Sequence, residues 1–300
     1  MLKKALCLAA CLALLPSCAP GQTAVPAHDR DGLPARQSAA PTITRLESPV
    51  PHSPEPTPSP TPTPTGLVSR NHNEAAEAYS VPARQVQQWL ATQPTDGSKQ
   101  IFLTFDDGPN HAMTPRILDV LREQGVPATF FVLGKAVADA PDVLKRQIEE
   151  GHAIGLHSFT HQYGYLYLER RGNAVNILVE FDQSVAAVRA VLGEGFAPGP
   201  WRYPGGHMSW RDLAPADAGL ADQGVHWVDW NALNGDAEPK RRRPGTPSKM
   251  VAMATEPIRA GVSTVVLLAH DAEGKDLTLQ TLPQVIEAYR GAGYEFHVIG

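Results

Sequence analysis

From Lys99 onward, short apolar, β-prone segments alternate with helical patterns at least seven times. Alternation of this kind over roughly 200 residues is typical of a parallel sheet whose crossover connections are helices. No glycine-rich phosphate-binding turn follows the first strand, which favours a barrel over a dinucleotide-binding sheet. We therefore predict an α/β barrel of parallel strands, with strands at 101–105, 128–132, 153–157, 200–203, 225–230, 263–269 and 294–299.

The connections between these strands have helix signals of their own. Thr114 followed by Pro115 predicts an N-cap and a first-turn proline. A long helix is predicted over 173–193, because the apolar residues of this stretch recur at a helical period. These residues are Val175, Leu178, Phe181, Val185, Val188 and Leu192.

The N-terminal part of the chain has the layout of an export signal. Lys3 and Lys4 precede an apolar run over 5–15, which is too short to span a membrane comfortably. The run ends in LPSC, which resembles the lipobox of bacterial lipoproteins and makes Cys18 the residue to be acylated. We predict a lipoprotein-type signal segment over 1–18 and a membrane anchor at Cys18; the alternative is an ordinary cleaved signal with a chance cysteine.

Composition separates the rest of the chain into three parts. Residues 19–66 are rich in Pro, Thr and Ser, show no apolar periodicity, and are predicted to form a disordered tether that would let a folded domain reach into a cell wall. Residues 67–97 read as a lead-in segment with one short helix, and 98–300 as the folded domain. The net charge of −5 gives no reason to expect nucleic-acid binding, and we expect a monomer.

Two adjacent carboxylates, Asp106 and Asp107, end the first predicted strand in the stretch IFLTFDDGPNHAMTP. Like charges side by side repel and lose hydration, so a positive partner is expected nearby. His157 and His161 follow the third strand at a four-residue interval, which would aim both imidazoles the same way if the chain turns helically there. One carboxylate and two histidines form a catalytic three-ligand metal site, while the second carboxylate stays free to take a proton from water.

No thiolate can contribute to such a site, because Cys7, Cys11 and Cys18 all lie at the extreme N-terminus.

Other motifs at strand ends fit the same chemistry. Arg202 could pair with a carboxylate base and keep it ionised, and a backbone N–H at the glycines that follow could face a developing oxyanion. His270 could act as the general acid, oriented by either Asp229 or Asp236.

Five motifs carry a family resemblance: TFDDG, HSFTH, RYPGG, the Trp/Asp segment HWVDWNALNGD, and LLAH. In this order they resemble the polysaccharide deacetylase family, also called the NodB-homology domain or carbohydrate esterase family 4, over about 98–300. The resemblance implies a distorted (β/α)7 barrel. It also implies metal-dependent removal of N-acetyl or O-acetyl groups from sugars, most often with Zn²⁺, although a site of this type also accepts Co²⁺, Ni²⁺ or Mn²⁺.

The resemblance also assigns roles motif by motif. Asp107, His157 and His161 correspond to the metal ligands, and Leu268 to a pocket residue for the acetyl methyl. The catalytic set comprises the base Asp106, its partner Arg202, the acid His270 and the tuning residue Asp236 (or Asp229). The RYPGG motif supplies the other expected substrate-binding residues, Tyr203, Pro204 and Gly205.

Two departures from the family pattern affect the expected substrate wall. Gly205 stands where the family usually has an aromatic residue, so the backbone donor is kept but the side chain is lost. Asp236 is followed by Ala237 rather than by Trp. We expect a deacetylase of acetylated polysaccharide, peptidoglycan or chitin-type first; the alternatives are a silent carbohydrate-binding protein of the same fold and a metal hydrolase of small amides.

Other histidines and a basic run are expected to lie outside the catalytic set. His111 is read as a surface residue, and His207 as one that could touch substrate. His152, His226 and His297 are expected at element edges or in packing. The basic run over 240–244 is read as a solvated loop, with attraction of an anionic wall polymer as the alternative.

Overall fold

The structure is a computed structural model, and it describes residues 70–300. The predicted signal segment, Cys18 and the tether therefore lie outside the described residues. Within 70–300, no helix combines the length and the apolar character needed to cross a membrane.

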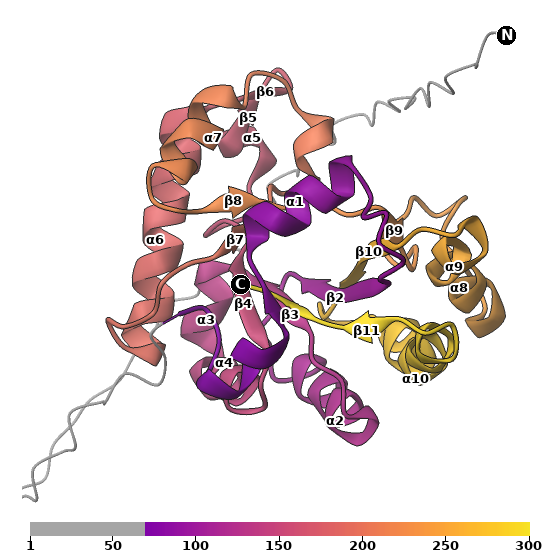
Figure 1. Ribbon diagram of the computed structural model, residues 1–300. Helices are drawn as coiled ribbons and strands as arrows, with labels where there is room; N and C mark the ends of the chain where they lie inside the picture. The colour runs from indigo at the N-terminus through magenta and orange to yellow at the C-terminus, as the bar shows by residue number, and fades with distance from the viewer. Residues whose placement is uncertain (1–69) are drawn as a thin grey trace, which may run out of the picture. The chain divides into compact units, whose positions relative to one another are not determined.

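A single parallel sheet forms the centre of the described domain (Figure 1). Its strand order is β8-β7-β4-β3-β2-β10-β9. In addition, β11 pairs with the first two residues of β2, whereas β3 pairs with the last three. The bounds are β2 (Gln100–Asp106), β3 (Thr129–Val132), β4 (Ala153–Leu156), β7 (Pro200–Trp201), β8 (His226–Trp227), β9 (Ala232–Leu233), β10 (Thr264–His270) and β11 (Glu295–Phe296). Among these strands, β8 and β9 do not pair, so the curled sheet stays open along that edge. The predicted α/β barrel with parallel strands is confirmed in this distorted form.

Each predicted strand appears, with shorter bounds for several of them. The last one, 294–299, divides at His297 into β11 and β12 (Val298–Ile299), and β12 pairs in parallel with β1 (Ser80–Val81). Four two-residue strands were not predicted, since so short a segment shows no period: β1, β9, and the antiparallel pair β5 (Tyr167–Leu168) and β6 (Arg171–Gly172).

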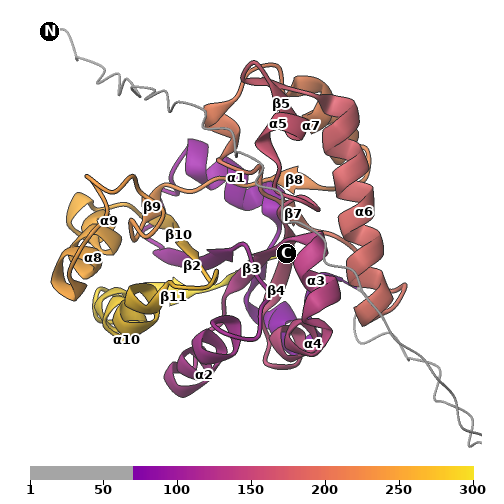
Figure 2. The same ribbon diagram turned by 180° about the vertical axis from the view of Figure 1, so that it is seen from behind.

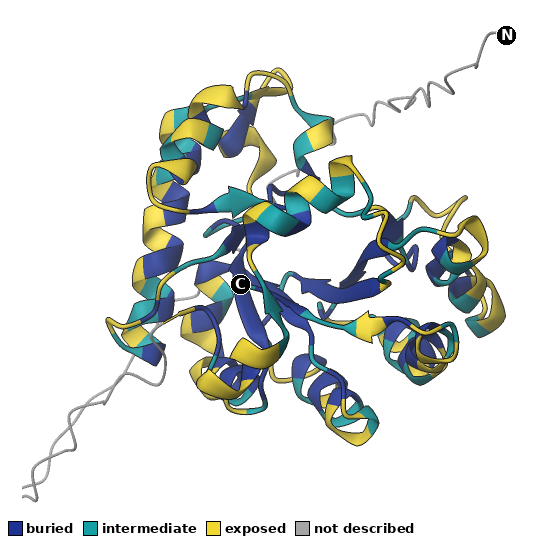
Figure 3. Cartoon of the chain, viewed as in Figure 1, coloured by how far each residue is buried: buried dark blue, intermediate teal, exposed yellow. Residues whose placement is uncertain are grey.

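Helices surround the sheet on its outer face, as the two opposite views show (Figure 2). Those that follow the strands are α2 (Thr114–Gln124), α3 (Gly134–Asp139), α4 (Pro141–Glu149), α5 (Tyr163–Leu166), α6 (Ala174–Leu192), α7 (Ala214–Ala221), α8 (Pro247–Ala254), α9 (Glu256–Ala260) and α10 (Asp276–Gly291). Two short 3-10 helices, Glu74–Tyr79 and His207–Ser209, complete the described elements together with α1 (Ala83–Ala91). Buried residues line the inner sides of these helices and the exposed ones face outward (Figure 3).

The long predicted helix is α6, and most of its apolar stripe is buried. Val175 has 71% of its surface exposed and Leu178 is half-buried, so the apolar period begins before the buried face does. The predicted N-cap at Thr114 is displaced by one residue, because α2 begins at Thr114 and Met113 occupies the cap position. The Thr114 hydroxyl instead donates a hydrogen bond to Asp271 (2.6 Å).

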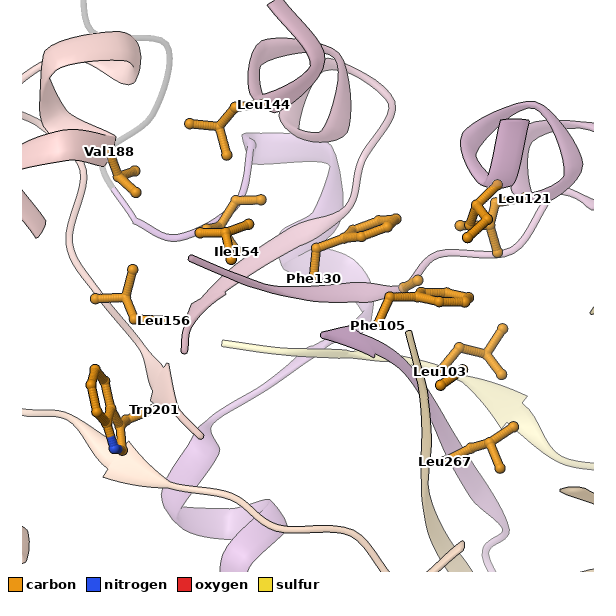
Figure 4. Packing of buried hydrophobic residues seen from close by; sticks show 14 of the residues in the cluster. Leu103, Phe105, Leu121, Phe130, Leu144, Ile154, Leu156, Val188, Trp201 and Leu267 are labelled. Carbon is orange, nitrogen blue, oxygen red and sulfur yellow. The ribbon is translucent and has the colours of Figure 1, made fainter. Parts of the chain in front are cut away.

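Alternation along β2 decides which side chains face the helices and which face the barrel interior. Leu103 and Phe105 pack outward against the helices in the main hydrophobic core (Figure 4). Phe102 belongs to a separate inner cluster, and Asp106 shares its side of the strand because the two positions differ by four. The period of a strand therefore places the Asp106 carboxylate inside the barrel, at the end where β2 stops.

The lead-in segment is part of this inner packing. Val86 of α1 is completely buried and packs with Val266 and Ile299. The Asn71 amide donates hydrogen bonds to the carbonyls of Ile154 (3.1 Å) and Ile299 (2.8 Å), which fixes the beginning of the segment on the bottom of the sheet.

Candidate active site

A cavity of about 330 Å³ lies where the carboxyl ends of β2, β4, β7 and β10 meet. This is the end at which parallel barrels carry their functional side chains. Most of the predicted site residues line it: Asp106, Asp107, His157, His161, Gly205, Asp236, Leu268 and His270. Three do not line it. Arg202 is fully buried behind Asp106, Tyr203 is fully buried with its hydroxyl on Asp217 (2.8 Å), and Pro204 lies outside the cavity lining.

Asp107, His157 and His161 offer one ligand atom each, and these atoms all lie within 4.8 Å of one another. Oδ1 of Asp107 is 3.9 Å from Nε2 of His157 and 3.7 Å from Nε2 of His161. Nδ1 of His157 is hydrogen-bonded to the backbone carbonyl of Arg202 (2.8 Å), so it carries the proton and leaves Nε2 free to bind a cation. Burial lowers the pKa of His157 to about 3, which keeps the imidazole neutral as a metal ligand must be. The three groups therefore suit a divalent metal.

The segment from His157 to His161 is not the helical turn that the spacing suggested. Ser158 and His161 have positive φ angles (71° and 62°), and the helix that follows, α5, begins only at Tyr163. The two imidazole rings still meet, with centroids 5.0 Å apart, because the loop folds back on itself.

Glu180 holds this loop and was missed by the sequence analysis. Its buried carboxylate, on α6, accepts hydrogen bonds from the backbone N–H groups of Phe159 (3.0 Å) and Thr160 (2.9 Å) and from the Thr160 hydroxyl. A carboxylate that accepts several hydrogen bonds compensates the cost of its burial. The available signal was a charged residue on the apolar face of α6, beside Ile177 and Phe181.

The turn after β2, which carries Asp107, is held in a similar way. Asp271 accepts hydrogen bonds from Gly108 N–H (2.8 Å) and from the Thr114 hydroxyl. A side chain at position 108 would collide with the Asp271 carboxylate, so the glycine is required there. Complete burial raises the pKa of Asp271 to about 7.

Arg202 is the positive partner that the paired aspartates needed. Its Nη1 donates to Oδ1 of Asp106 (2.7 Å) and to the Thr104 hydroxyl (2.8 Å), and its guanidinium lies 3.8 Å from the centre of the Phe131 ring. The pKa of Asp106 is nevertheless raised, because its burial outweighs the charge of Arg202. Asp106 is thus a buried carboxylate with increased basicity. Arg202 balances its negative charge, so Asp106 does not need to bind a metal.

His270 pairs with Asp236 and not with Asp229. Nδ1 of His270 is 2.7 Å from Oδ1 of Asp236, and the backbone N–H of His270 donates to Oδ2 of Asp236 (3.0 Å). Asp229 instead accepts from the backbone N–H groups of His207 (2.8 Å) and Met208 (3.2 Å). Burial alone would lower the pKa of His270, but the hydrogen bond and charge of Asp236 outweigh it and raise that pKa. The same pairing lowers the pKa of Asp236 against the opposing effect of burial.

Comparison with known proteins agrees with this geometry. A family model described as polysaccharide deacetylase matches residues 93–219. A chitooligosaccharide deacetylase from Bradyrhizobium sp. (strain ANU 289) is 33% identical over an alignment of 218 residues, and the match covers 67% of this chain and 89% of that protein. The chain belongs to the polysaccharide deacetylase family.

Other members of the polysaccharide deacetylase family are similar in sequence and in structure. A peptidoglycan-N-acetylglucosamine deacetylase from Listeria monocytogenes serotype 1/2a (strain 10403S) is 30% identical over 203 residues, 67% of this chain and 38% of that protein. The solved structure of a Streptococcus mutans CE4 esterase superposes with a TM-score of 0.74 at 44% identity and covers 79% of this chain and all of that chain. These similarities agree with the distorted barrel seen here.

In this polysaccharide deacetylase the other histidines among residues 70–300 do not line the catalytic cavity. His111 is exposed and 2.9 Å from Asp142, as expected for a surface residue. His207 stacks on Trp227 with ring centres 3.8 Å apart and lines a neighbouring groove. His152 is buried, and burial lowers its pKa to about 3. The basic run is exposed over 240–243, and its Arg242 is 2.9 Å from Glu238, which lines the catalytic cavity.

Proposed function

We propose that this protein is a metal-dependent hydrolase that removes acetyl groups from N-acetylated polysaccharide of the chito-oligosaccharide or peptidoglycan type. One observation carries the proposal. A carboxylate and two imidazoles suited to a divalent cation share a cavity with a second, arginine-paired carboxylate and with an aspartate-paired histidine. A protein that only bound sugar would have no use for two separate proton-transfer groups beside a metal site.

Asp107, His157 and His161 would hold the metal, with Zn²⁺ the first candidate and Co²⁺, Ni²⁺ or Mn²⁺ also compatible with this donor set. When bound, a divalent ion supplies Lewis acidity that polarises the acetyl carbonyl and makes a water molecule easier to deprotonate.

The proton transfers fall to residues on either side of this site. Asp106, held by Arg202, takes a proton from the attacking water, and a backbone N–H at Gly205 is available to the oxyanion that develops on the acetyl group. His270, protonated and held by Asp236, gives a proton to the leaving nitrogen as its bond to the acetyl carbon breaks. The products are acetate and the free amine of the sugar. Leu268 lines the same cavity, and we propose that it contacts the acetyl methyl.

The substrate class rests on the relatives, whose names specify chitooligosaccharide and peptidoglycan N-acetylglucosamine. Both are polymers of N-acetylated hexosamine, so the amide is the first bond to test and an O-acetyl ester the second. We further propose that the protein is exported and anchored in the cell envelope through Cys18, which would keep the enzyme close to peptidoglycan. The signal-like composition of residues 1–18 supports this location.

Acetate release from a chitotetraose and from purified peptidoglycan tests the proposal. We expect acetate and free amine from at least one of them, loss of activity with a chelator, and recovery when Zn²⁺ is added back. Asp107→Ala should not recover, because the carboxylate that holds the ion is gone. Retention of polymer without acetate would identify a binding protein, and hydrolysis of small amides alone would identify the third alternative.

A further inference from the structure

Tyr163 lines the catalytic cavity, although no motif pointed to it. It is the first residue of α5, and 45% of its surface is exposed. Its ring centre lies 5.2 Å from that of His161, a candidate metal ligand. An exposed aromatic face thus stands directly beside the site where the acetyl group would react.

The ring occupies space that position 205 leaves empty. Gly205 has a φ of 79°, a conformation that favours glycine. A Cβ atom at that position would lie 3.2 Å from the Tyr163 hydroxyl oxygen and 3.3 Å from Cζ2 of Trp210, tighter than ordinary contact. The wall that the missing side chain would have formed is therefore formed by Tyr163, which comes from the start of α5.

Other aromatic residues hold Tyr163 in this position. Its ring centre is 5.4 Å from that of Trp210, which stacks on Tyr167 at 3.9 Å with an interplanar angle of 10°. Trp210 is fixed in turn by a hydrogen bond from its indole N–H to the carbonyl of Pro204 (2.8 Å). A ring supported from behind loses little freedom when a ligand covers its other face.

We propose that Tyr163 is a substrate-positioning residue, whose ring packs against the N-acetylhexosamine bound at the metal site and whose hydroxyl donates a hydrogen bond to a sugar oxygen. The inference rests on the proposed function and deepens it. Tyrosine suits this task because it combines a large apolar face with one polar group at its tip. Ring contacts orient the sugar, and orientation controls whether the acetyl carbonyl reaches the catalytic groups.

Three variants and two substrates test the assignment. Tyr163→Ala removes ring and hydroxyl, and Tyr163→Phe removes the hydroxyl alone. Tyr165→Ala is the matched control, because Tyr165 lies on the same helix with 41% of its surface exposed but does not line the cavity. The substrates are chitotetraose and 4-nitrophenyl acetate, an ester that has an acetyl group but no sugar. Binding of chitotetraose to the metal-free protein, measured by calorimetry, adds a readout that does not depend on catalysis.

For chitotetraose, we expect Tyr163→Ala to lower kcat/KM about 10- to 100-fold, mostly through KM, since misplaced substrate costs factors of this order. Tyr163→Phe should lose about three- to tenfold, the share of one neutral hydrogen bond. Hydrolysis of 4-nitrophenyl acetate should change less than about twofold in both variants, and Tyr165→Ala should match the wild type on both substrates.

Equal losses on both substrates would show that Tyr163 merely supports the metal loop, and no loss on chitotetraose would show that it does not contact the sugar. Either result overturns the assignment and leaves the proposed function intact. A wild-type protein that hydrolyses the ester but releases no acetate from chitotetraose or peptidoglycan overturns the proposed function, and the assignment with it.

Discussion

At the scale of single residues, Asp106 and His270 face one cavity with their proton affinities shifted for different reasons. Burial raises the pKa of Asp106 in spite of the Arg202 charge, and Asp236 raises the pKa of His270 in spite of burial. In the proposed reaction Asp106 must be ionised and His270 protonated. A bell-shaped dependence of kcat/KM on pH follows, because activity is lost when Asp106 becomes protonated at low pH and when His270 loses its proton at high pH. The alkaline limb should lie above the ordinary range of histidine.

Asp236→Asn should move the alkaline limb alone. The substitution removes the hydrogen-bonded charge that raises the pKa of His270 and leaves burial, which lowers it. The protonated acid is then lost at lower pH, so activity should fall more at pH 8 than at pH 6. A pH profile of kcat/KM measures this directly. An alkaline limb that stays in place would show that His270 is not the group responsible for it.

Glu180 permits a second test at this scale, because it touches the metal loop without touching the cavity. Glu180→Gln keeps the size of the side chain but removes the negative charge of the carboxylate, which accepts hydrogen bonds from two backbone N–H groups of the loop. We expect the affinity for Zn²⁺ to fall about tenfold, as is typical when the residues that orient metal ligands are changed. Competition with a chromogenic chelator measures it.

The exposed Asp182 on the same helix supplies the control for this test. Asp182→Asn should leave the affinity for Zn²⁺ unchanged. Equal affinities in Glu180→Gln and Asp182→Asn would contradict the proposed role of Glu180.

At the scale of elements, α1 covers the opening of the barrel, where backbone groups of the sheet have no neighbouring strand to pair with. It contacts β8 and β10 on the two sides of the opening. The Gln87 amide of α1 donates to the carbonyl of Trp227 (3.0 Å), and the side chain of Gln93, just after α1, accepts from Thr264 N–H (2.6 Å). Side-chain amides thus replace part of the missing strand pairing, and Val86 fills the interior behind them.

Val86→Ala should destabilise the domain by about 2 kcal/mol, the cost of removing two methyl groups from a buried site plus the space they leave. Urea unfolding followed by circular dichroism measures the free energy of unfolding. Gln88→Ala, at an exposed position of the same helix, should change that free energy by less than about 0.5 kcal/mol. Equal effects of the two substitutions would mean that α1 contributes no core packing.

At the scale of the whole molecule, the proposed envelope anchor can be tested separately from the chemistry. Cys18→Ser removes the only thiol in the LPSC motif and with it the acylation site. We expect the full-length wild type to partition into the detergent phase of a membrane extract, and the variant to move to the aqueous phase with kcat/KM on chitotetraose unchanged. A variant that stays with the membrane would point to another mode of attachment.

Much of this protein follows from local sequence. Strand and helix periods are local properties, so the parallel α/β barrel could be predicted, and motifs at strand ends placed Asp106, Asp107, His157, His161, Arg202 and His270 in one site because carboxyl ends of parallel strands meet. Other features could not be predicted from local sequence, because each depends on partners distant in the chain. These are the two-residue strands, the division at His297 and the non-helical loop before His161.

The chain alone therefore determines the class of fold and the chemical groups of the site. Tertiary structure decides which of two aspartates supports His270, that Glu180 and Asp271 hold the loops of the metal site, and that Tyr163 stands over Gly205. The physical reason is range: backbone periodicity is set by neighbours a few residues away, whereas hydrogen bonds and ring contacts join residues that only the folded chain brings together.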